Sequence, residues 1–266
     1  MNNIKFFNED CINTMKNMIE FKQKINCILT SPPYSTGRKS NGEYSTKTYK
    51  SRYDIYLDEK TSEEYCDWCI ELFNYFDKIL IENGVVLWNV SYGNNITDRP
   101  DSIGVMWLSI ADIIKKTNFT VADKIVWKKK SALPNNRSSN KLTRITEDVF
   151  VFCRKNEIKT FNANKELSNI GKNGLPYYKN YFNFIEAKNN DGMCDLNKAT
   201  YSTDLCKQLL SLYSKKGDII YDPFMGTGTT AIACEELGMN CFGSELSEAQ
   251  VQYSIKRLEN FRNNNK

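Results

Sequence analysis

The chain has 266 residues, enough for one α/β domain with a small insertion or for two small domains. Hydrophobic residues make up 41% and charged residues 26%, as in soluble proteins, and no run of roughly 18 apolar residues predicts a membrane span. The basic excess, 36 − 32 = 4, is compatible with a nucleic-acid partner, and the lack of histidine excludes Ser-His triads, HExxH metal sites and imidazole bases.

Short apolar segments alternate with helical patterns along the chain. Strands are expected at 4–7, 26–30, 85–90, 121–127, 147–153, 218–222 and 240–244, and helices near 10–20, 62–81, 102–117, 203–214, 228–238 and 247–261. Several strands, such as 147–153, contain continuous apolar runs, which are typical of strands covered on both faces. The alternation predicts an α/β fold with a doubly wound, mainly parallel seven-stranded sheet.

Two of the nine cysteines, Cys66 and Cys69, have the CxxC spacing. They fall in the segment 62–81, whose apolar residues recur at helical intervals, so we expect two thiols on a helix rather than a redox motif. Residues 1–5 do not begin the apolar stretch of a signal peptide. We therefore expect reduced thiols and a cytoplasmic location.

Two polar regions interrupt the alternation. Residues 35–60 are rich in Ser, Thr, Lys, Tyr and Gly, and residues 155–200 are rich in Asn, Lys and Tyr with weak periodicity. A compact domain seldom holds loops of this length unless they are functional or disordered. Each region is therefore interpreted either as a functional insertion or as a mobile surface loop.

Residues 219–230 (Ile-Ile-Tyr-Asp-Pro-Phe-Met-Gly-Thr-Gly-Thr-Thr) predict a strand, a glycine-rich turn and a helix. Gly226 and Gly228 let the backbone come close to a ligand. Glu245 ends the next strand, 245 − 222 = 23 residues after Asp222, near the spacing at which an acidic residue reaches ribose hydroxyls. The sequence lacks the third glycine of a dinucleotide site and the Gly-Lys-Ser/Thr of a Walker A motif, which favours a compact adenosyl ligand.

Residues 30–34 (Thr-Ser-Pro-Pro-Tyr) follow a buried-type strand, at the edge where open α/β sheets bind ligands. The two prolines hold the backbone extended and leave carbonyl acceptors without N–H donors. Acceptors aimed at an aromatic amine would make it more nucleophilic toward a methyl sulfonium, and the tyrosine ring would fix the plane of the base. The alternative is a rigid turn, and the glycine-rich loop at 226–228 favours the catalytic interpretation.

These two motifs together resemble those of the DNA amino-methyltransferases, which make N4-methylcytosine or N6-methyladenine. The catalytic motif (D/N/S)PPY is matched by Ser31, Pro32, Pro33 and Tyr34. The cofactor motif, like DPFxGSGT, is matched by residues 222–229 with Thr in place of Ser, and its position after the catalytic motif is similar to the permuted β class. The resemblance implies a Rossmann-like methyltransferase fold, S-adenosylmethionine as methyl donor, no metal, and duplex DNA with a flipped base as substrate.

The resemblance also implies a set of cofactor-binding residues. Asp10, in the segment 8–11, is expected to contact the adenosine moiety, and Glu245 the ribose. The helix before the cofactor strand departs from the His-x-x-Phe-Pro-like stretch of the family, since residues 198–205 are Lys-Ala-Thr-Tyr-Ser-Thr-Asp-Leu. The expected cofactor-binding set is Asp10, Thr30, Thr203, Asp222, Pro223, Phe224, Gly226, Thr227, Gly228 and Glu245.

The target side is expected to involve both polar and basic segments. Residues 127–129 and 147–150 resemble later target-side motifs of the family. Candidates for phosphate contacts are Lys128, Lys129, Lys130 and Arg137, and the alternative for this run is a solvated face. We expect 1–154 to form the catalytic half, 155–200 a small target-recognition insertion and 201–266 the cofactor half. The resemblance implies a restriction–modification context, allows a homodimer and involves no membrane.

Ser31 stands where many members of the family carry Asp. In the family, Ser goes mostly with cytosine N4 and Asp with adenine N6, and residues 52–68 and 88–90 also resemble the N4 members. We therefore expect methylation of cytosine N4. Methylation of adenine N6 is the nearest alternative, because a hydroxyl and a carboxylate both accept from an amine. The further alternatives are methylation of RNA or of a protein side chain, and a non-catalytic nucleic-acid-binding module.

Overall fold

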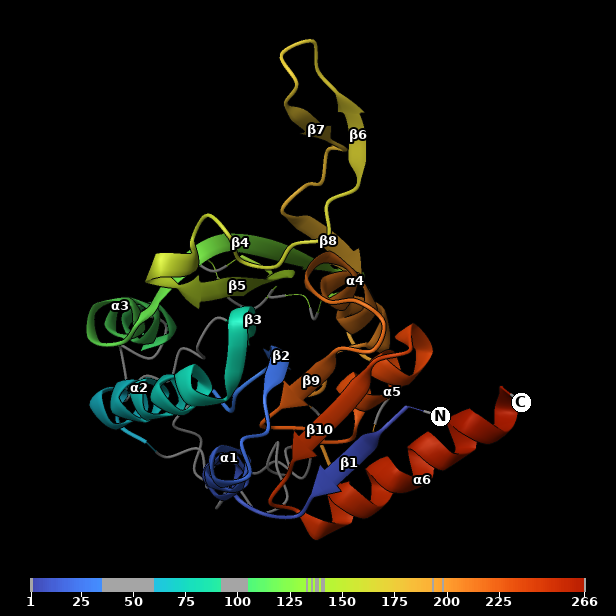
Figure 1. Cartoon of the computed structure of the whole chain (residues 1–266). Helices are drawn as coiled ribbons and strands as arrows, with labels where there is room; N and C mark the ends of the chain where they lie inside the picture. Colours follow the sequence, from blue (N-terminus) through green and yellow to red (C-terminus); the bar gives the residue numbers. More distant parts are fainter. Residues whose placement is uncertain are drawn as a thin grey trace.

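The computed structural model describes residues 2–34, 60–91, 105–132, 134, 136, 139, 142–192, 194–197 and 199–265. Its centre is an eight-stranded sheet in the order β1-β10-β9-β2-β3-β5-β4-β8 (Figure 1). The strands of this sheet are β1 (Ile4–Phe7), β2 (Ile25–Thr30), β3 (Leu80–Val90), β4 (Phe119–Lys129), β5 (Thr146–Arg154), β8 (Phe184–Ala187), β9 (Ile219–Asp222) and β10 (Asn240–Ser244). The helices are α1 (Cys11–Glu20), α2 (Ser62–Ile79), α3 (Val105–Lys116), α4 (Thr203–Tyr213), α5 (Thr229–Leu237) and α6 (Glu248–Asn264).

The sheet is mainly parallel. The strands from β1 through β10, β9 and β2 to β3 pair in parallel, as do β4 and β8, whereas β5 pairs antiparallel with β3 and β4. All seven predicted strands are present, so the predicted fold class is confirmed. The eighth strand, β8, lies in the polar region 155–200 and pairs with β4 at the edge of the sheet.

Alternate residues of the same strands form two apolar layers, one on each face of the sheet. Along β3, Val86 and Trp88 pack with α1, α2 and α3, whereas Val85 and Leu87 pack with α4 and α5 (Figure 1). Successive side chains of a strand point to opposite faces, so a continuous apolar run can be buried on both. The two layers are those of a doubly wound sheet.

The carboxyl ends of four parallel strands meet at one edge of the sheet. Each is followed by a turn or a helix start. Asp10 caps α1 after β1, accepting from the N–H of Ile12 at 2.8 Å, and Ser247 caps α6 after β10, accepting from the N–H of Gln250 at 3.2 Å. The residues after β2 and β9 are the two sequence motifs, so the fold brings both motifs to the same edge.

The region 155–200 contains more regular structure than its sequence predicts. A short 3-10 helix (Lys155–Glu157) is followed by a hairpin of β6 (Leu167–Ile170) and β7 (Pro176–Tyr178), which projects from the body of the molecule (Figure 1). Large apolar side chains are exposed along this projection, namely Leu167, Ile170, Leu175, Tyr177, Tyr178, Tyr181 and Phe182. The assignment of 155–200 to target recognition stays a prediction.

Helix α2 carries both cysteines of the CxxC sequence. Cys66 and Cys69 are free and buried on this helix, so the prediction of two thiols on a helix is confirmed. The helix ends at Ile79 because Leu80 adopts an extended conformation and begins β3 directly. Among the described helices, none combines the length and apolarity needed to cross a membrane.

Phe73 of α2 offers a test of the packing of this layer. Its side chain is fully buried and contacts four other aromatic rings, the nearest being Phe152 at 4.8 Å between centroids. Phe73→Ala is expected to lower the free energy of unfolding by about 3–5 kcal/mol, measured by urea denaturation. Phe182→Ala, at a side chain that is 80% exposed, is the control and should change it by less than about 0.5 kcal/mol. Equal effects of the two variants would contradict the packing described.

Candidate active site

The glycine-rich turn between β9 and α5 depends on two glycines with positive φ. Gly226 has a φ of +55° and Gly228, which caps α5, has a φ of +80°. A Cβ at Gly228 would also lie 2.9 Å from the Cβ of Ser254. A side chain at Gly228 would be strained by the positive φ and would also clash with Ser254, which explains why this position is a glycine.

Asp222 lies at the start of this turn and is 1% exposed. Its carboxylate accepts from the hydroxyls of Thr30 at 2.7 Å, Thr230 at 2.6 Å and Tyr201 at 2.9 Å and from the N–H of Phe224 at 3.0 Å. Burial raises the pKa of the Asp222 carboxyl above its usual value, and the four hydrogen bonds act in the opposite direction. The side chain therefore fastens the turn to β2 from below.

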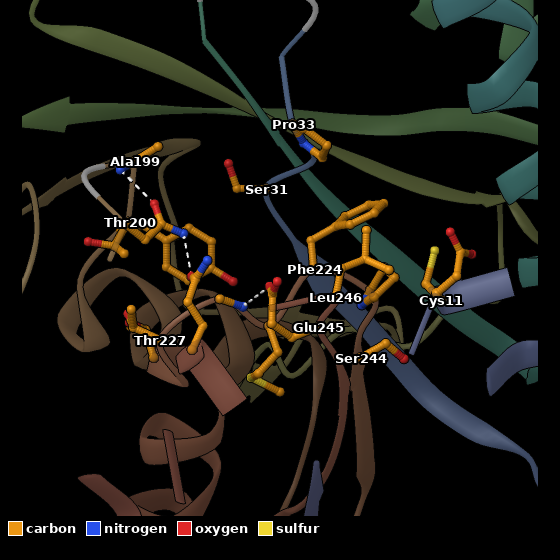
Figure 2. A pocket seen from close by; sticks show the side chains of 18 of the residues that line it. Cys11, Ser31, Pro33, Ala199, Thr200, Phe224, Thr227, Ser244, Glu245 and Leu246 are labelled. Carbon is orange, nitrogen blue, oxygen red and sulfur yellow. Dashed lines mark hydrogen bonds between the residues drawn. The ribbon is translucent and has the colours of Figure 1, made fainter. Parts of the chain in front are cut away.

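Glu245 follows β10 and holds the turn from its other side. One carboxylate oxygen accepts from the N–H of Gly226 at 3.0 Å (Figure 2). The other accepts from the N–H of Ser247 at 2.9 Å. The side chain of Asn8 donates to the main-chain carbonyls of Glu245 and Leu246 at 3.0 and 2.9 Å. These bonds fix the carboxylate of Glu245 at the wall of a pocket.

The pocket lies at the carboxyl edge of the sheet, between the two sequence motifs. Figure 2 shows Ser31 and Pro33 at one end, with Phe224 on one side and Ala199 and Thr200 on the other. Its lining comes from the segments that follow β1, β2, β9 and β10, from α1, α2, α5 and α6, and from the segment before α4. The lining residues are Glu9, Asp10, Cys11, Ser31, Pro33, Lys60, Trp68, Asn197, Ala199, Thr200, Tyr201, Pro223, Phe224, Met225, Gly226, Thr227, Thr229, Ser244, Glu245, Leu246 and Gln250.

Aromatic side chains form one wall of this pocket. The rings of Trp68 and Phe224 lie 5.4 Å apart and are tilted by 44°. The ammonium of Lys60 lies 6.0 Å from the Trp68 ring centroid. Flat apolar faces of this kind suit a planar ring in a ligand.

The segment before α4 closes the opposite wall. The amide of Asn197 donates to the side chain of Gln250 on α6 at 3.0 Å, and its carbonyl accepts from the N–H of Ala199 at 2.8 Å. Arg257 of α6 donates to the main-chain carbonyl of Thr227 at 3.1 Å. These contacts hold the segment and the glycine-rich turn against the same helix.

The catalytic motif is held by short polar contacts. The hydroxyls of Ser31 and Tyr34 lie 2.7 Å apart, and the amide of Asn89 donates to both, at 3.3 and 3.1 Å. Tyr34 is 7% exposed and packs in the apolar layer, whereas Ser31 is half-buried and lines the pocket. The Ser31 hydroxyl is therefore placed where the pocket meets the carboxyl end of β2.

The structure places most of the predicted site residues around one cavity. Those that line it are Asp10, Ser31, Pro33, Pro223, Phe224, Gly226, Thr227 and Glu245. Thr30 and Asp222 are bonded to each other beneath the turn, Gly228 caps α5, and Pro32 and Tyr34 are buried behind Ser31. Thr203 begins α4, where its N–H and hydroxyl donate to Asp191, and it does not line the pocket.

The three lysines at 128–130 do not share one environment. The ammonium groups of Lys128 and Lys129 pair with Glu186 and Glu147, at 2.7 and 2.5 Å, whereas Lys130 is exposed beside them. The hydrogen bond from Lys128 holds the pKa of the Glu186 carboxyl below its usual value. Arg137 and residues 35–59, which hold most of the first polar region and the start of the segment 52–68, lie outside the described residues.

Several lining residues were not predicted from the sequence. Trp68 is one of the aromatic residues of a helical pattern, and nothing in that pattern marks it as facing a ligand. Asn197, Tyr201 and Gln250 reach the pocket from segments that are far from both motifs. Their placement depends on tertiary contacts rather than on local sequence.

A family model described as DNA methylase matches residues 25–256, most of the chain. The chain belongs to this N6/N4 family of DNA methylases. It is 23% identical to the Type II methyltransferase M.Cfr9I of Citrobacter freundii, covering 97% of this chain and 89% of that protein. It is 26% identical to the Type II methyltransferase M2.DpnII of Streptococcus pneumoniae, covering 89% and 83%. The predicted resemblance to DNA amino-methyltransferases is thereby confirmed.

Solved structures of DNA methyltransferases share the fold. The PvuII DNA methyltransferase (cytosine-N4-specific) superimposes with a TM-score of 0.69 at 16% identity, covering 99% of this chain and 92% of that chain. A complex of M1.HpyAVI with SAM gives a TM-score of 0.60 at 20% identity, covering 96% and 98%. The predicted Rossmann-like methyltransferase fold is confirmed by these likenesses.

The buried carboxylate of Asp222 predicts a specific pH dependence of stability. The pKa of Asp222 is raised in the folded state. Its contribution to the free energy of unfolding is therefore fully present below the usual pKa of 3.8, and it is lost as the pH rises through the folded pKa. Asp222→Asn removes this titration. The stability of the variant relative to the wild type should therefore increase as the pH rises above 3.8, measured by urea unfolding of both proteins across a pH series. A difference that does not vary with pH would contradict the raised pKa.

Proposed function

We propose that this DNA methyltransferase transfers a methyl group from S-adenosylmethionine to the exocyclic N4 amine of cytosine in duplex DNA. The observation that carries the proposal is Ser31, a neutral hydroxyl acceptor at the wall of the pocket in the first position of the catalytic motif. The likeness to the PvuII enzyme, which is cytosine-N4-specific, supports the choice of base. The Type II methyltransferases among its relatives support a restriction–modification context.

The chemistry of the pocket suits S-adenosylmethionine. Asp10 and Glu245 offer carboxylates to the amine and hydroxyl groups of an adenosine, and Phe224 and Trp68 offer aromatic faces to its flat base. The glycine turn at 226–228 leaves room for close approach of the ligand to the backbone. When bound, the cofactor supplies a methyl group on a positively charged sulfur, which a neutral amine can attack directly.

The residues of the catalytic motif orient the amine. Ser31 and the main-chain carbonyl of Pro32 accept hydrogen bonds from its N–H groups, and Tyr34, buried behind Ser31, holds the Ser31 hydroxyl through a contact of 2.7 Å. The amine lone pair is delocalised into the ring of the base, and acceptors on its hydrogens increase its nucleophilicity. Positioning of this kind supplies much of the acceleration, so the reaction needs neither histidine nor a covalent enzyme–base intermediate.

The DNA binds across the pocket mouth, and the target base leaves the duplex at an unstacking cost of about a few kcal/mol. Residues 155–200 recognise the sequence as an insertion between a catalytic half, 1–154, and a cofactor half, 201–266. The exposed aromatic residues Tyr177 and Tyr178 of the hairpin β6–β7 support this role, because the hairpin projects from the body of the protein. The candidates for phosphate contacts are Lys128, Lys129, Lys130 and Arg137.

The identity of the methylated base tests the proposal directly. DNA methylated by the purified chain with S-adenosylmethionine is hydrolysed, and its nucleosides are separated and identified by mass spectrometry. N4-methylcytosine is the expected product. N6-methyladenine as the only product would replace the N4 assignment by its adenine alternative, and the absence of both would contradict an amino-methyltransferase.

Ser31→Ala tests the role of the hydroxyl. The variant loses one acceptor for the amine while the cofactor wall is unchanged, so kcat should fall by about 100-fold with an unchanged Kd for S-adenosylmethionine. Methyl transfer to DNA and calorimetry measure the two quantities. Ser211→Ala, at an exposed position of α4, is the control. Wild-type kcat in Ser31→Ala would contradict the assigned role.

A further inference from the structure

A buried polar chain leads away from the catalytic motif into the sheet. Asn89, near the end of β3, is 2% exposed and contacts Ser31 and Tyr34 through its amide nitrogen. The same nitrogen donates to a carboxylate oxygen of Glu147 at 3.0 Å. Asn89 stands opposite Val149 in the pairing of β3 with β5, so Glu147 lies two residues along β5 on the same face of the sheet.

The ion pair behind Asn89 fixes the position of the carboxylate. Glu147 is 8% exposed, and its second oxygen pairs with the ammonium of Lys129 on β4 at 2.5 Å. This ammonium also lies 4.9 Å from the ring centroid of Trp127, which is buried. A carboxylate that accepts from a lysine ammonium in this way is a strong acceptor for an amide N–H.

The Asn89 amide has fewer N–H bonds than acceptors around it. The amide group has two N–H bonds, and three acceptors surround its nitrogen. The Glu147 carboxylate takes one N–H, which leaves the other for the oxygens of Ser31 and Tyr34. The amide oxygen of Asn89 is buried and has no hydrogen-bond partner among the residues that the structure describes.

That unpartnered oxygen shows that the amide orientation is imposed. A rotated amide would present its oxygen to the hydroxyls of Ser31 and Tyr34, which can both donate, and would satisfy it. The rotation would also place this oxygen against the Glu147 carboxylate, so the charge on Glu147 prevents it. The charge therefore selects the orientation in which Asn89 donates to the catalytic motif.

We propose that Lys129, Glu147 and Asn89 are positioning residues that hold the hydroxyls of Ser31 and Tyr34 in the geometry required for methyl transfer. The proposal rests on the amino-methyltransferase function and deepens it. Lys129 orients the Glu147 carboxylate, Glu147 orients the Asn89 amide, and the amide fixes the two hydroxyl oxygens. This gives Lys129 a role that differs from the phosphate contact suggested by its place in a lysine run.

The decisive variants are Glu147→Leu and Glu147→Gln. Glu147→Leu removes the acceptor, so kcat is expected to fall about 10- to 100-fold, since small misplacements in an active site have effects of this size. The Kd for S-adenosylmethionine should stay within about twofold, because none of Asn89, Glu147 and Lys129 lines the pocket. Glu147→Gln retains an oxygen that can accept from Asn89 but removes the charge that selects the amide orientation, so it should recover only part of the kcat that Glu147→Leu loses.

The chain provides a matched control on the same two strands. Lys124 of β4 pairs with Asp148 of β5 at 2.9 Å, and neither contacts the catalytic motif. Lys124→Met breaks this pair at a residue outside the target-side motifs and should therefore keep the wild-type kcat. An equal loss of kcat in Lys124→Met and Glu147→Leu would mean that any ion pair between β4 and β5 has this effect, which would overturn the proposal. Wild-type kcat in Glu147→Leu would also overturn it.

Asn89→Ala and Lys129→Met complete the test. The double variant Asn89→Ala/Glu147→Leu should lose no more kcat than the more affected single variant, because both changes interrupt the same series of contacts from Lys129 to the catalytic motif. Lys129→Met should lower kcat and leave the salt dependence of DNA binding unchanged, whereas a phosphate contact would reduce its slope by about one. Multiplicative losses in the double variant, or a reduced salt slope with wild-type kcat, would overturn the proposal.

The readout separates this proposal from the choice of base. Transfer of radiolabelled methyl groups to DNA reports kcat for methylation of either cytosine or adenine. The nucleoside analysis alone decides the base, so an N6-methyladenine product would remove the N4 assignment while the kcat ratios still test the positioning chain.

Discussion

The site depends on one buried carboxylate. Asp222 is enclosed at the carboxyl edge of the sheet, where an unpaired charge would cost several kcal/mol, about the size of the whole stability of a small domain. Its donors include Thr30, 192 residues earlier in the chain, and Thr230 at the start of α5. The carboxylate is satisfied only when the two halves of the chain meet. The same bond places Ser31, the next residue after Thr30, beside the glycine-rich turn.

The catalytic segment is thus held from two sides. On the cofactor side, Thr30 is fastened to Asp222, and on the other side the hydroxyls of Ser31 and Tyr34 are bonded to Asn89. Strand β2 lies between β9 and β3 in the sheet, so both sets of contacts come from its immediate neighbours. The two prolines between Ser31 and Tyr34 limit the remaining freedom of the backbone. A reaction that depends on orientation of an amine benefits from a segment restrained in this way.

The local sequence predicts those parts of the molecule that depend on interactions between residues close together in the chain. The apolar runs of β3 and β5 and the glycines of the turn after Asp222 carry their own signals, and the strands and both motifs lie where the sequence predicts them. Strand β8 was missed because only two of its four residues are buried and its partner is distant in sequence. The bond between Asn89 and Glu147 joins residues 58 positions apart, and neither residue is unusual in its own segment. The role of Asp222 shows the same limit, since its motif marks the residue while only the fold shows that its carboxylate points beneath the pocket.

Charge distribution around the amine provides the last constraint. In the proposed transfer, positive charge moves from sulfur to nitrogen and its total does not change, so the site needs oriented dipoles more than a net charge. Ser31, Tyr34 and Asn89 are neutral and lie at or directly behind the pocket wall, whereas Glu147 and Lys129 neutralise each other one layer further from it. The ion pair can then orient the amide of Asn89 without adding a net charge beside the base.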